Sequence, residues 1–152
     1  MGALFPIKDV DRAVYRDAIA DFLPAEIVDV HTHVWKEEHT HRDASAYARV
    51  VSWPSLVAKD GPIEELVEGY RLLFPGKVVT PLIFSSIHEG DDMDVMNAYV
   101  SECAAAHRFP ALVYAHPTWS GEELERKIRA GRFIGAKVYL DLSPSYLPRR
   151  EI

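Results

Sequence analysis

Apolar runs of strand length alternate with helical patterns along this chain of 152 residues. We expect strands near residues 26–34, 77–84, 111–116 and 133–140, because each run is short, apolar and bounded by proline, glycine or charged residues. Strands that are separated by helices need crossover connections, and such connections produce a parallel sheet. The alternation therefore predicts an α/β fold.

The segments between these runs carry helix signals. An apolar repeat of helical spacing covers residues 9–23, and Pro24 ends it. Pro62, Asp92 and Ser120 stand where three further helices begin. The four strands form either a small doubly wound sheet or half of an eight-stranded barrel, and the apolar pattern alone does not separate the two.

Two histidines, His31 and His33, lie near the end of the first predicted strand. Side chains alternate between the faces of a strand, so both imidazoles point the same way from Cα atoms about 6.6–6.8 Å apart. They converge on a point where a cation would be bound at about 2.0–2.1 Å. The same alternation predicts Asp29 on the histidine face and Val28 and Val30 on the opposite, apolar face.

Four more side chains are candidates for this site. Asp29 either orients an imidazole through a hydrogen bond or accepts one from a neighbouring backbone group. Lys137, in the middle of the fourth strand, either extends to solvent, pairs with an acid, or points into the same cavity as the histidines. Tyr139 shares the face of Lys137, and His116 ends the third strand. Tyr139 either contacts a substrate or packs as an ordinary tyrosine. His116 either contacts a substrate or a metal ligand, or is simply a polar residue at a strand end.

Residues 29–33, Asp-Val-His-Thr-His, resemble the first-strand motif of the metal-dependent amidohydrolase superfamily, and of its amidohydrolase-related branch in particular. Two further features add to the likeness. Leu23-Pro24 ends a helix just before the strand, and residues 135–137 match the Gly-x-Lys pattern of a fourth strand. The likeness extends over about residues 10–142.

The resemblance implies that residues 1–152 form a single partial domain, the N-terminal half (about four βα units) of a (β/α)8 barrel with its site at the carboxyl ends of the strands. It implies that His31 and His33 bind a divalent metal, zinc above all, with one or two ions. Lys137 matches the position of a carboxylated lysine that bridges two metals in some members. A free ammonium repels a dication, whereas a carbamate offers anionic oxygens.

The implied activity is that of a metal-dependent hydrolase acting on an amide, a lactone or a related carbonyl substrate. In such enzymes the metal lowers the pKa of bound water and polarises the carbonyl. A full barrel needs about 250 residues, and a catalytic zinc site usually has three protein ligands. We therefore expect an incomplete enzyme whose open strand edges favour pairing of two copies or association with a C-terminal half.

Three other functions remain open at this stage. A non-hydrolytic decarboxylase of the same fold shares these motifs. A metal-dependent phosphoesterase or deoxyribonuclease also opens with His-x-His, but the sequence lacks the basic or glycine-rich anion cradle that phosphate favours. In the third, the chain is an inactive half-barrel that mediates assembly, and its histidines are structural and retain no metal.

Composition narrows the partners and the compartment. The chain has 17 basic and 23 acidic residues and a net charge of -6, which argues against nucleic acid or an anionic membrane as the main partner. The resemblance implies a small-molecule substrate instead. Cys103 is the only cysteine, so an internal disulfide is excluded and a reducing compartment is favoured. Without a signal peptide or a long apolar run, the expected location is the cytoplasm.

Overall fold

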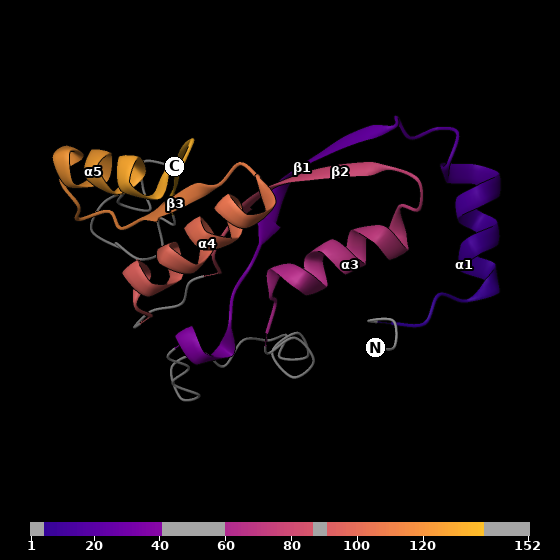
Figure 1. The fold of residues 1–152 in the computed structure, drawn as a ribbon, viewed down its shortest axis with the longest axis horizontal. Helices are drawn as coiled ribbons and strands as arrows, with labels where there is room; N and C mark the ends of the chain where they lie inside the picture. The colour runs from indigo at the N-terminus through magenta and orange to yellow at the C-terminus, as the bar shows by residue number, and fades with distance from the viewer. Residues whose placement is uncertain (1–4, 41–59, 87–90, 139–152) are drawn as a thin grey trace, which may run out of the picture.

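The structure, a computed structural model, describes residues 5–40, 60–86 and 91–138. The helices and strands follow one another in the order expected for an α/β chain (Figure 1). They are α1 (Asp9–Val14), the π-helical turn η1 (Tyr15–Ile19), β1 (Glu26–His33), the 3-10 turn η2 (Glu37–His39), α3 (Ile63–Leu73), β2 (Val78–Phe84), α4 (Met93–His107), β3 (Leu112–Ala115), α5 (Gly121–Gly131) and β4 (Gly135–Val138). The predicted alternation of strands and helices is confirmed.

The strands are parallel and follow chain order across the sheet. β1 pairs with β2, and β3 pairs with β4. One parallel bridge, Ile83 with Ala111, joins the two pairs, and the Ile83 N–H donates to the Pro110 carbonyl at 3.0 Å. No closure of the strands into a barrel is seen among the residues that the structure describes.

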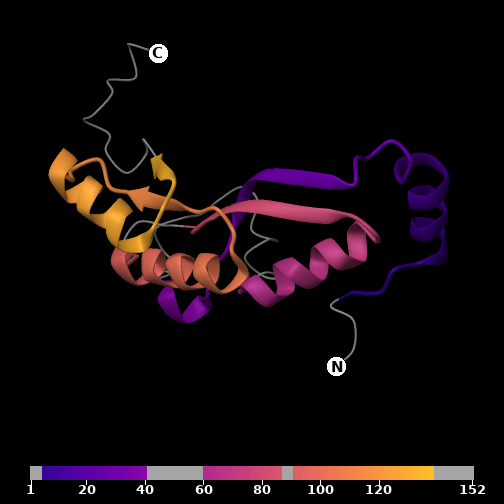
Figure 2. The same ribbon diagram turned by 45° about the horizontal axis from the view of Figure 1, so that its top comes forward.

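Three helices cover the same side of these strands. Figures 1 and 2 show α3 and α4 beneath the strands on one side of the sheet. The helix α5 lies beside α4, where the Ser101 hydroxyl donates to the Gly131 carbonyl at 3.1 Å. We call this side of the sheet the helix face. The helix α4 packs against both strands that it connects, β2 and β3, and α5 packs against β3.

The β1–β2 ladder contains a β-bulge. Asp29 pairs with Pro81 and Thr32 pairs with Ile83, so three residues of β1 advance while β2 advances by two. Such a bulge inserts one extra residue into one strand and breaks the alternation of its side chains. Proline is tolerated beside a bulge, which explains why Pro81 does not end β2.

The core lies between the helix face and α4. Asn97 of α4 is buried there and binds the backbone of Tyr114 twice, as donor to the carbonyl at 2.9 Å and as acceptor from the N–H at 2.7 Å. Val95, in the first turn of the same helix, is exposed. The buried residues of the central cluster are Val34, Ile63, Ile83, Tyr99, Val100, Cys103, Ala111, Val113 and Phe133.

The N-terminal helix stands apart from this core (Figure 1). It is shorter than the predicted range of 9–23, since α1 passes into η1 and regular hydrogen bonding ends at Ile19. Lys77 then binds the carbonyls of Ala20 and Leu23 at 2.6 and 2.8 Å, as a cation does at a helix C-terminus. The apolar side chain of Phe22 stays 85% exposed.

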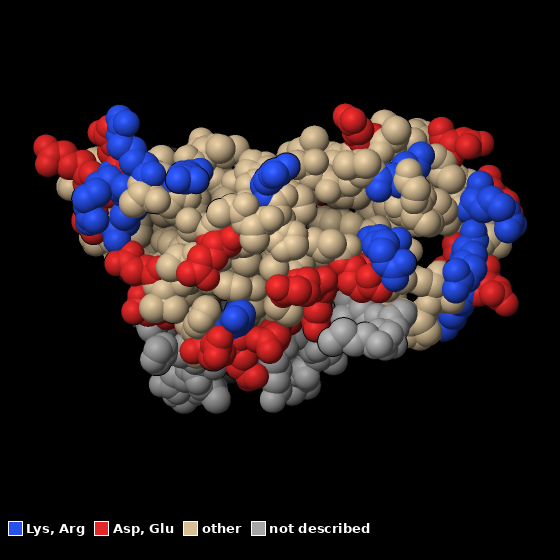
Figure 3. Space-filling view, viewed as in Figure 1, with Lys and Arg blue, Asp and Glu red and all other residues tan. Residues whose placement is uncertain are grey.

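Charged side chains of both signs occupy the surface. On the face in Figure 3, acidic side chains gather over the middle of the molecule, and basic side chains lie mostly toward its two ends. No helix among the described residues combines the length and the apolar character needed to cross a membrane.

Candidate metal centre

The side chains of His31 and His33 meet at the carboxyl end of β1. Their Nε2 atoms lie 3.3 Å apart. Two nitrogens bound to one metal at about 2.0–2.1 Å with tetrahedral angles are separated by about 3.3–3.4 Å. The two imidazoles therefore have the spacing of two ligands on one tetrahedral ion.

The backbone of β2 fixes the ring of His33. The His33 Nδ1 atom lies 3.0 Å from the carbonyl oxygen of Ser85, so Nδ1 carries the proton and donates. In the neutral ring this leaves the lone pair on Nε2, the atom that faces His31. A hydrogen bond from the other ring nitrogen is the usual way in which proteins orient a metal-binding histidine.

Local electrostatics favour the neutral form of this ring. Burial lowers the pKa of His33 below its ordinary value of 6.5, and nearby His31 and Lys137 lower it further. The hydrogen bond to Ser85 opposes the shift without reversing it. A neutral imidazole is the form that binds metals.

Phe84, the last residue of β2, lies at the centre of this cluster. Its ring centroid is 5.2 Å from that of His31 and 4.6 Å from that of His33. The Nζ atom of Lys137, from β4, lies 5.1 Å from the centroid of the same ring. Lys137 and the two histidines therefore share one face of the sheet, opposite the helix face, and we call it the histidine face.

The predicted position of Asp29 on the histidine face is wrong. Its Oδ2 atom accepts a hydrogen bond from the Tyr70 hydroxyl of α3 at 2.7 Å, so Asp29 lies on the helix face. The bulge after Asp29 shifts the alternation, and for the same reason Val28 and Val30 accompany the histidines instead of opposing them. Asp29 Oδ1 accepts the backbone N–H of His31 at 3.1 Å, and no described contact joins it to an imidazole.

The remaining two candidates are not part of the described cluster. His116 follows β3, and its Nδ1 atom is engaged locally, 2.8 Å from the Thr118 hydroxyl and 3.3 Å from the Thr118 nitrogen. Tyr139 lies outside the described residues, as does the last part of the strand predicted over 133–140. Their proposed roles stay predictions.

Sequence reasoning missed three residues that build the site. Phe84 ends β2 and Ser85 follows it, where a parallel sheet brings the carboxyl ends of neighbouring strands together. That rule would have found them once β1 and β2 were paired. The third is Tyr70 of α3, whose hydroxyl has its partner 41 positions away in β1, so no local sequence pattern indicates the contact.

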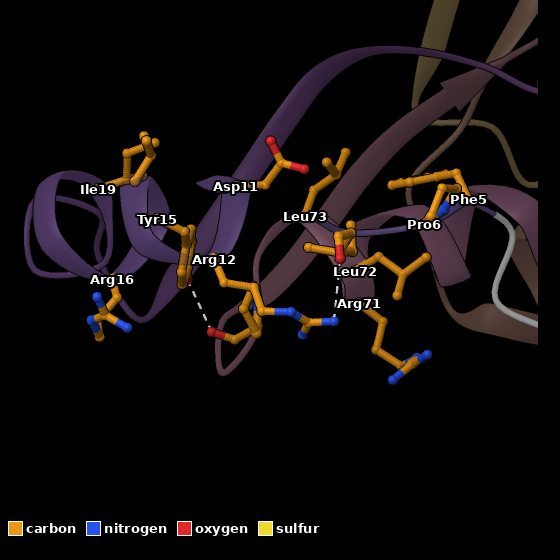
Figure 4. Close-up of a pocket in the computed structure, with 13 residues that line it drawn as sticks. Phe5, Pro6, Asp11, Arg12, Tyr15, Arg16, Ile19, Arg71, Leu72 and Leu73 are labelled. Carbon is orange, nitrogen blue, oxygen red and sulfur yellow. Dashed lines mark hydrogen bonds between the residues drawn. The ribbon is translucent and has the colours of Figure 1, made fainter. Parts of the chain in front are cut away.

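A further cavity in the described part of the chain lies away from the histidine face. A hollow of about 960 Å³ separates α1 and η1 from the end of α3 (Figure 4). Tyr15 spans it by donating to the Pro75 carbonyl at 2.9 Å. Its lining is mostly apolar, and its polar members are Asp11, Tyr15 and the arginines Arg12, Arg16 and Arg71.

Among the described residues, His31 and His33 are the two side chains that converge as possible metal ligands. Within residues 5–40, 60–86 and 91–138, no group of three or more histidine, cysteine, aspartate or glutamate side chains is placed to hold a metal ion. His31 and His33 fit an ion by the spacing and orientation of their Nε2 atoms, and they form an incomplete ligand set. Comparison of the chain with protein-family models, with curated proteins and with solved structures gives no match.

Proposed function

We propose that this chain supplies the His31 and His33 ligands of a divalent metal centre, most readily zinc, in a metal-dependent hydrolase of the amidohydrolase type. Its substrate would be an amide, a lactone or a related carbonyl compound. The observation that carries the proposal is the 3.3 Å separation of the two Nε2 atoms, with His33 anchored to Ser85 through its other nitrogen.

The arrangement of the sheet supports the barrel part of this proposal. Parallel strands in chain order with helices on one side are the winding of a (β/α)8 barrel. A doubly wound sheet reverses its strand order and carries helices on both faces. The described strands β1 to β4 follow the first pattern, and their functional side chains stand at the carboxyl ends, as they do in barrel enzymes.

Lys137 has the place expected of a group that works beside the histidines. Its Nζ atom lies over the ring of Phe84, which also contacts both imidazoles. In the proposed enzyme Lys137 would be carboxylated, because only the carbamate form offers oxygen atoms to a cation. In its ammonium form the same side chain would repel the ion.

The chain's own residues would bind and orient, and the metal would supply the activation of water and of the carbonyl group. The hydrogen bond to Ser85 would orient His33 so that its Nε2 lone pair faces the ion. His31 would supply the second nitrogen ligand from its own Nε2. Phe84 keeps water away from the inner side of both rings. The further ligand that a catalytic site needs would come from a second copy or from a C-terminal half.

Metal retention and hydrolysis test the proposal together. The chain would be loaded with Zn²⁺ or Mn²⁺, dialysed, analysed for metal and assayed with simple lactones and amides. We expect about one or two ions per active centre, and at least about 100-fold weaker binding after His31→Asn or His33→Asn, since losing a ligand costs more than losing an outer contact. His107→Asn, at the exposed end of α4, is the matched control and should bind as wild type does.

Each outcome bears on a different part of the proposal. Retention that does not change in either histidine variant would reject the metal centre. Release of CO2 from a carboxylate substrate without hydrolysis would replace the hydrolase with a decarboxylase. Metal binding without turnover by the chain, with turnover restored by a C-terminal half, would support an incomplete enzyme.

A further inference from the structure

We infer that Tyr70 and Asp29 form a clamp that holds the β-bulge of β1 and thereby positions His31 beside His33. Neither residue would touch a metal or a substrate, so both are positioning residues. The inference rests on the proposed function, because it gives the clamp its purpose.

The bulge takes two residues of β1 out of the register with β2. Val30 and His31 have no partner in the β1–β2 register, which passes from Asp29–Pro81 to Thr32–Ile83. An unpaired N–H in a sheet is costly unless another acceptor is found. Asp29 Oδ1 is that acceptor for His31, at 3.1 Å, so the carboxylate closes a local turn across the bulge.

Tyr70 fixes this carboxylate from the neighbouring helix. Its hydroxyl donates to Asp29 Oδ2 at 2.7 Å and lies 3.2 Å from the Thr32 hydroxyl, so it contacts the strand on both sides of the bulge. Thr32 is buried and Tyr70 is partly buried. These bonds join residues 38 and 41 positions apart in sequence, so they depend on the docking of α3 against β1.

The clamp keeps Asp29 and the two histidines on opposite faces of the sheet. With regular alternation, Asp29 would share a face with His31, and its carboxylate would lie beside the imidazoles. The bulge turns Asp29 toward α3 while His31 and His33 stay on the opposite face, with Nε2 atoms 3.3 Å apart. Loosening the bulge would widen the distribution of that separation and weaken any ion held between the two rings.

Co²⁺ titration of the full chain, followed by visible absorption, tests the clamp. We expect Tyr70→Phe to weaken Co²⁺ binding about tenfold, the effect typical of an outer contact to a metal ligand. Tyr15→Phe is the control, since it also removes a tyrosine hydroxyl that donates a hydrogen bond, here to the Pro75 carbonyl, but lies at the far cavity. Asp29→Asn retains one acceptor oxygen and should bind Co²⁺ better than Asp29→Ala.

Hydrogen exchange of the metal-free protein gives a second readout. The His31 amide should exchange several-fold faster in Tyr70→Phe than in wild type, while amides of β3 keep their rates. Unchanged His31 exchange together with unchanged Co²⁺ affinity in Tyr70→Phe would overturn the clamp and leave the metal centre standing. Wild-type protein that binds no Co²⁺ would overturn both. If Tyr70→Phe proves unfolded by circular dichroism, the Asp29→Asn and Asp29→Ala pair decides between the same outcomes.

Discussion

The two strand pairs of this sheet differ in regularity. β3 and β4 run in unbroken register from Leu112–Gly135 to Ala115–Val138. β1 and β2 are longer and contain a bulge between Asp29 and Thr32. The regular pair is anchored in the core through Tyr114 and Asn97, whereas the bulged pair carries the two histidines.

This difference in regularity changes which side chains each pair directs to the two faces of the sheet. In the regular pair, the two hydrogen bonds between the Asn97 side chain and the Tyr114 backbone hold α4 on β3. In the bulged pair, the interrupted ladder sends one side chain to the helix face and two imidazoles to the other. Bulges often lie beside active sites because they redirect a side chain without ending the strand.

The largest effect is expected at Phe84, where the bulged pair contributes its own buried core. Phe84 is almost fully buried under both histidines, so Phe84→Ala should lower the free energy of unfolding by about 3–5 kcal/mol. Urea denaturation measures this loss. Val78→Ala, on the same strand but 63% exposed, is the control and should cost far less. Equal costs would mean that the histidine end of β2 is not packed as described.

The second largest loss of stability is expected in the regular pair, at Asn97. Asn97→Leu leaves the buried N–H and carbonyl of Tyr114 without their partner, which should destabilise the fold by about 2–4 kcal/mol. Ser101→Ala removes one partly buried bond from the same helix and should cost about 1 kcal/mol. If thermal and urea unfolding rank the two variants equally, Asn97 does not anchor this pair.

A smaller effect is expected on the pH dependence of stability, and it arises from His33 in the bulged pair. The pKa of His33 lies below 6.5 in the folded protein, so the unfolded chain binds protons first as the pH falls. The metal-free protein should therefore lose stability as the pH drops through this region. His33→Asn lacks this contribution, and its unfolding free energy should depend less steeply on pH between 5 and 7, a range set by the ordinary histidine pKa of about 6.5. Parallel curves for the two proteins would contradict the description of the ring.

The smallest effect is expected on the histidine face away from the site. Val30 is 69% exposed, so Val30→Thr should change stability by no more than about 0.5 kcal/mol. Val113, in the regular pair, is fully buried, and Val113→Thr should cost about 1–3 kcal/mol for its buried hydroxyl. Chemical denaturation of both variants checks the contrast. A large cost at Val30 would instead mean that another chain covers this face.

Much of the fold follows from local signals in the sequence. The strand predicted over 26–34 is β1, Glu26–His33, and the capping residues Asp92 and Ser120 begin α4 and α5 where expected. These features depend on periodicity and on bonds within a few residues. The side-chain oxygen of Ser120 accepts the Glu123 N–H at 3.1 Å, a bond that the spacing alone predicts.

The site was only partly predictable, because its irregularity depends on distant contacts. Alternation placed His31 and His33 together, and the structure adds Lys137 to their face through Phe84. It failed for Asp29, since the bulge is bonded to Tyr70, which lies 41 positions away. The pattern of apolar residues does not predict a hydrogen bond between a tyrosine hydroxyl on a helix and a carboxylate on a strand.

X-ray absorption at the zinc edge of the Zn²⁺-loaded chain tests the central claim most directly. The account predicts a first shell that contains two imidazole nitrogens at about 2.0–2.1 Å, and loss of the imidazole signal in the His31→Asn/His33→Asn double variant. A shell without imidazole, or a spectrum that the double variant leaves unchanged, would contradict it.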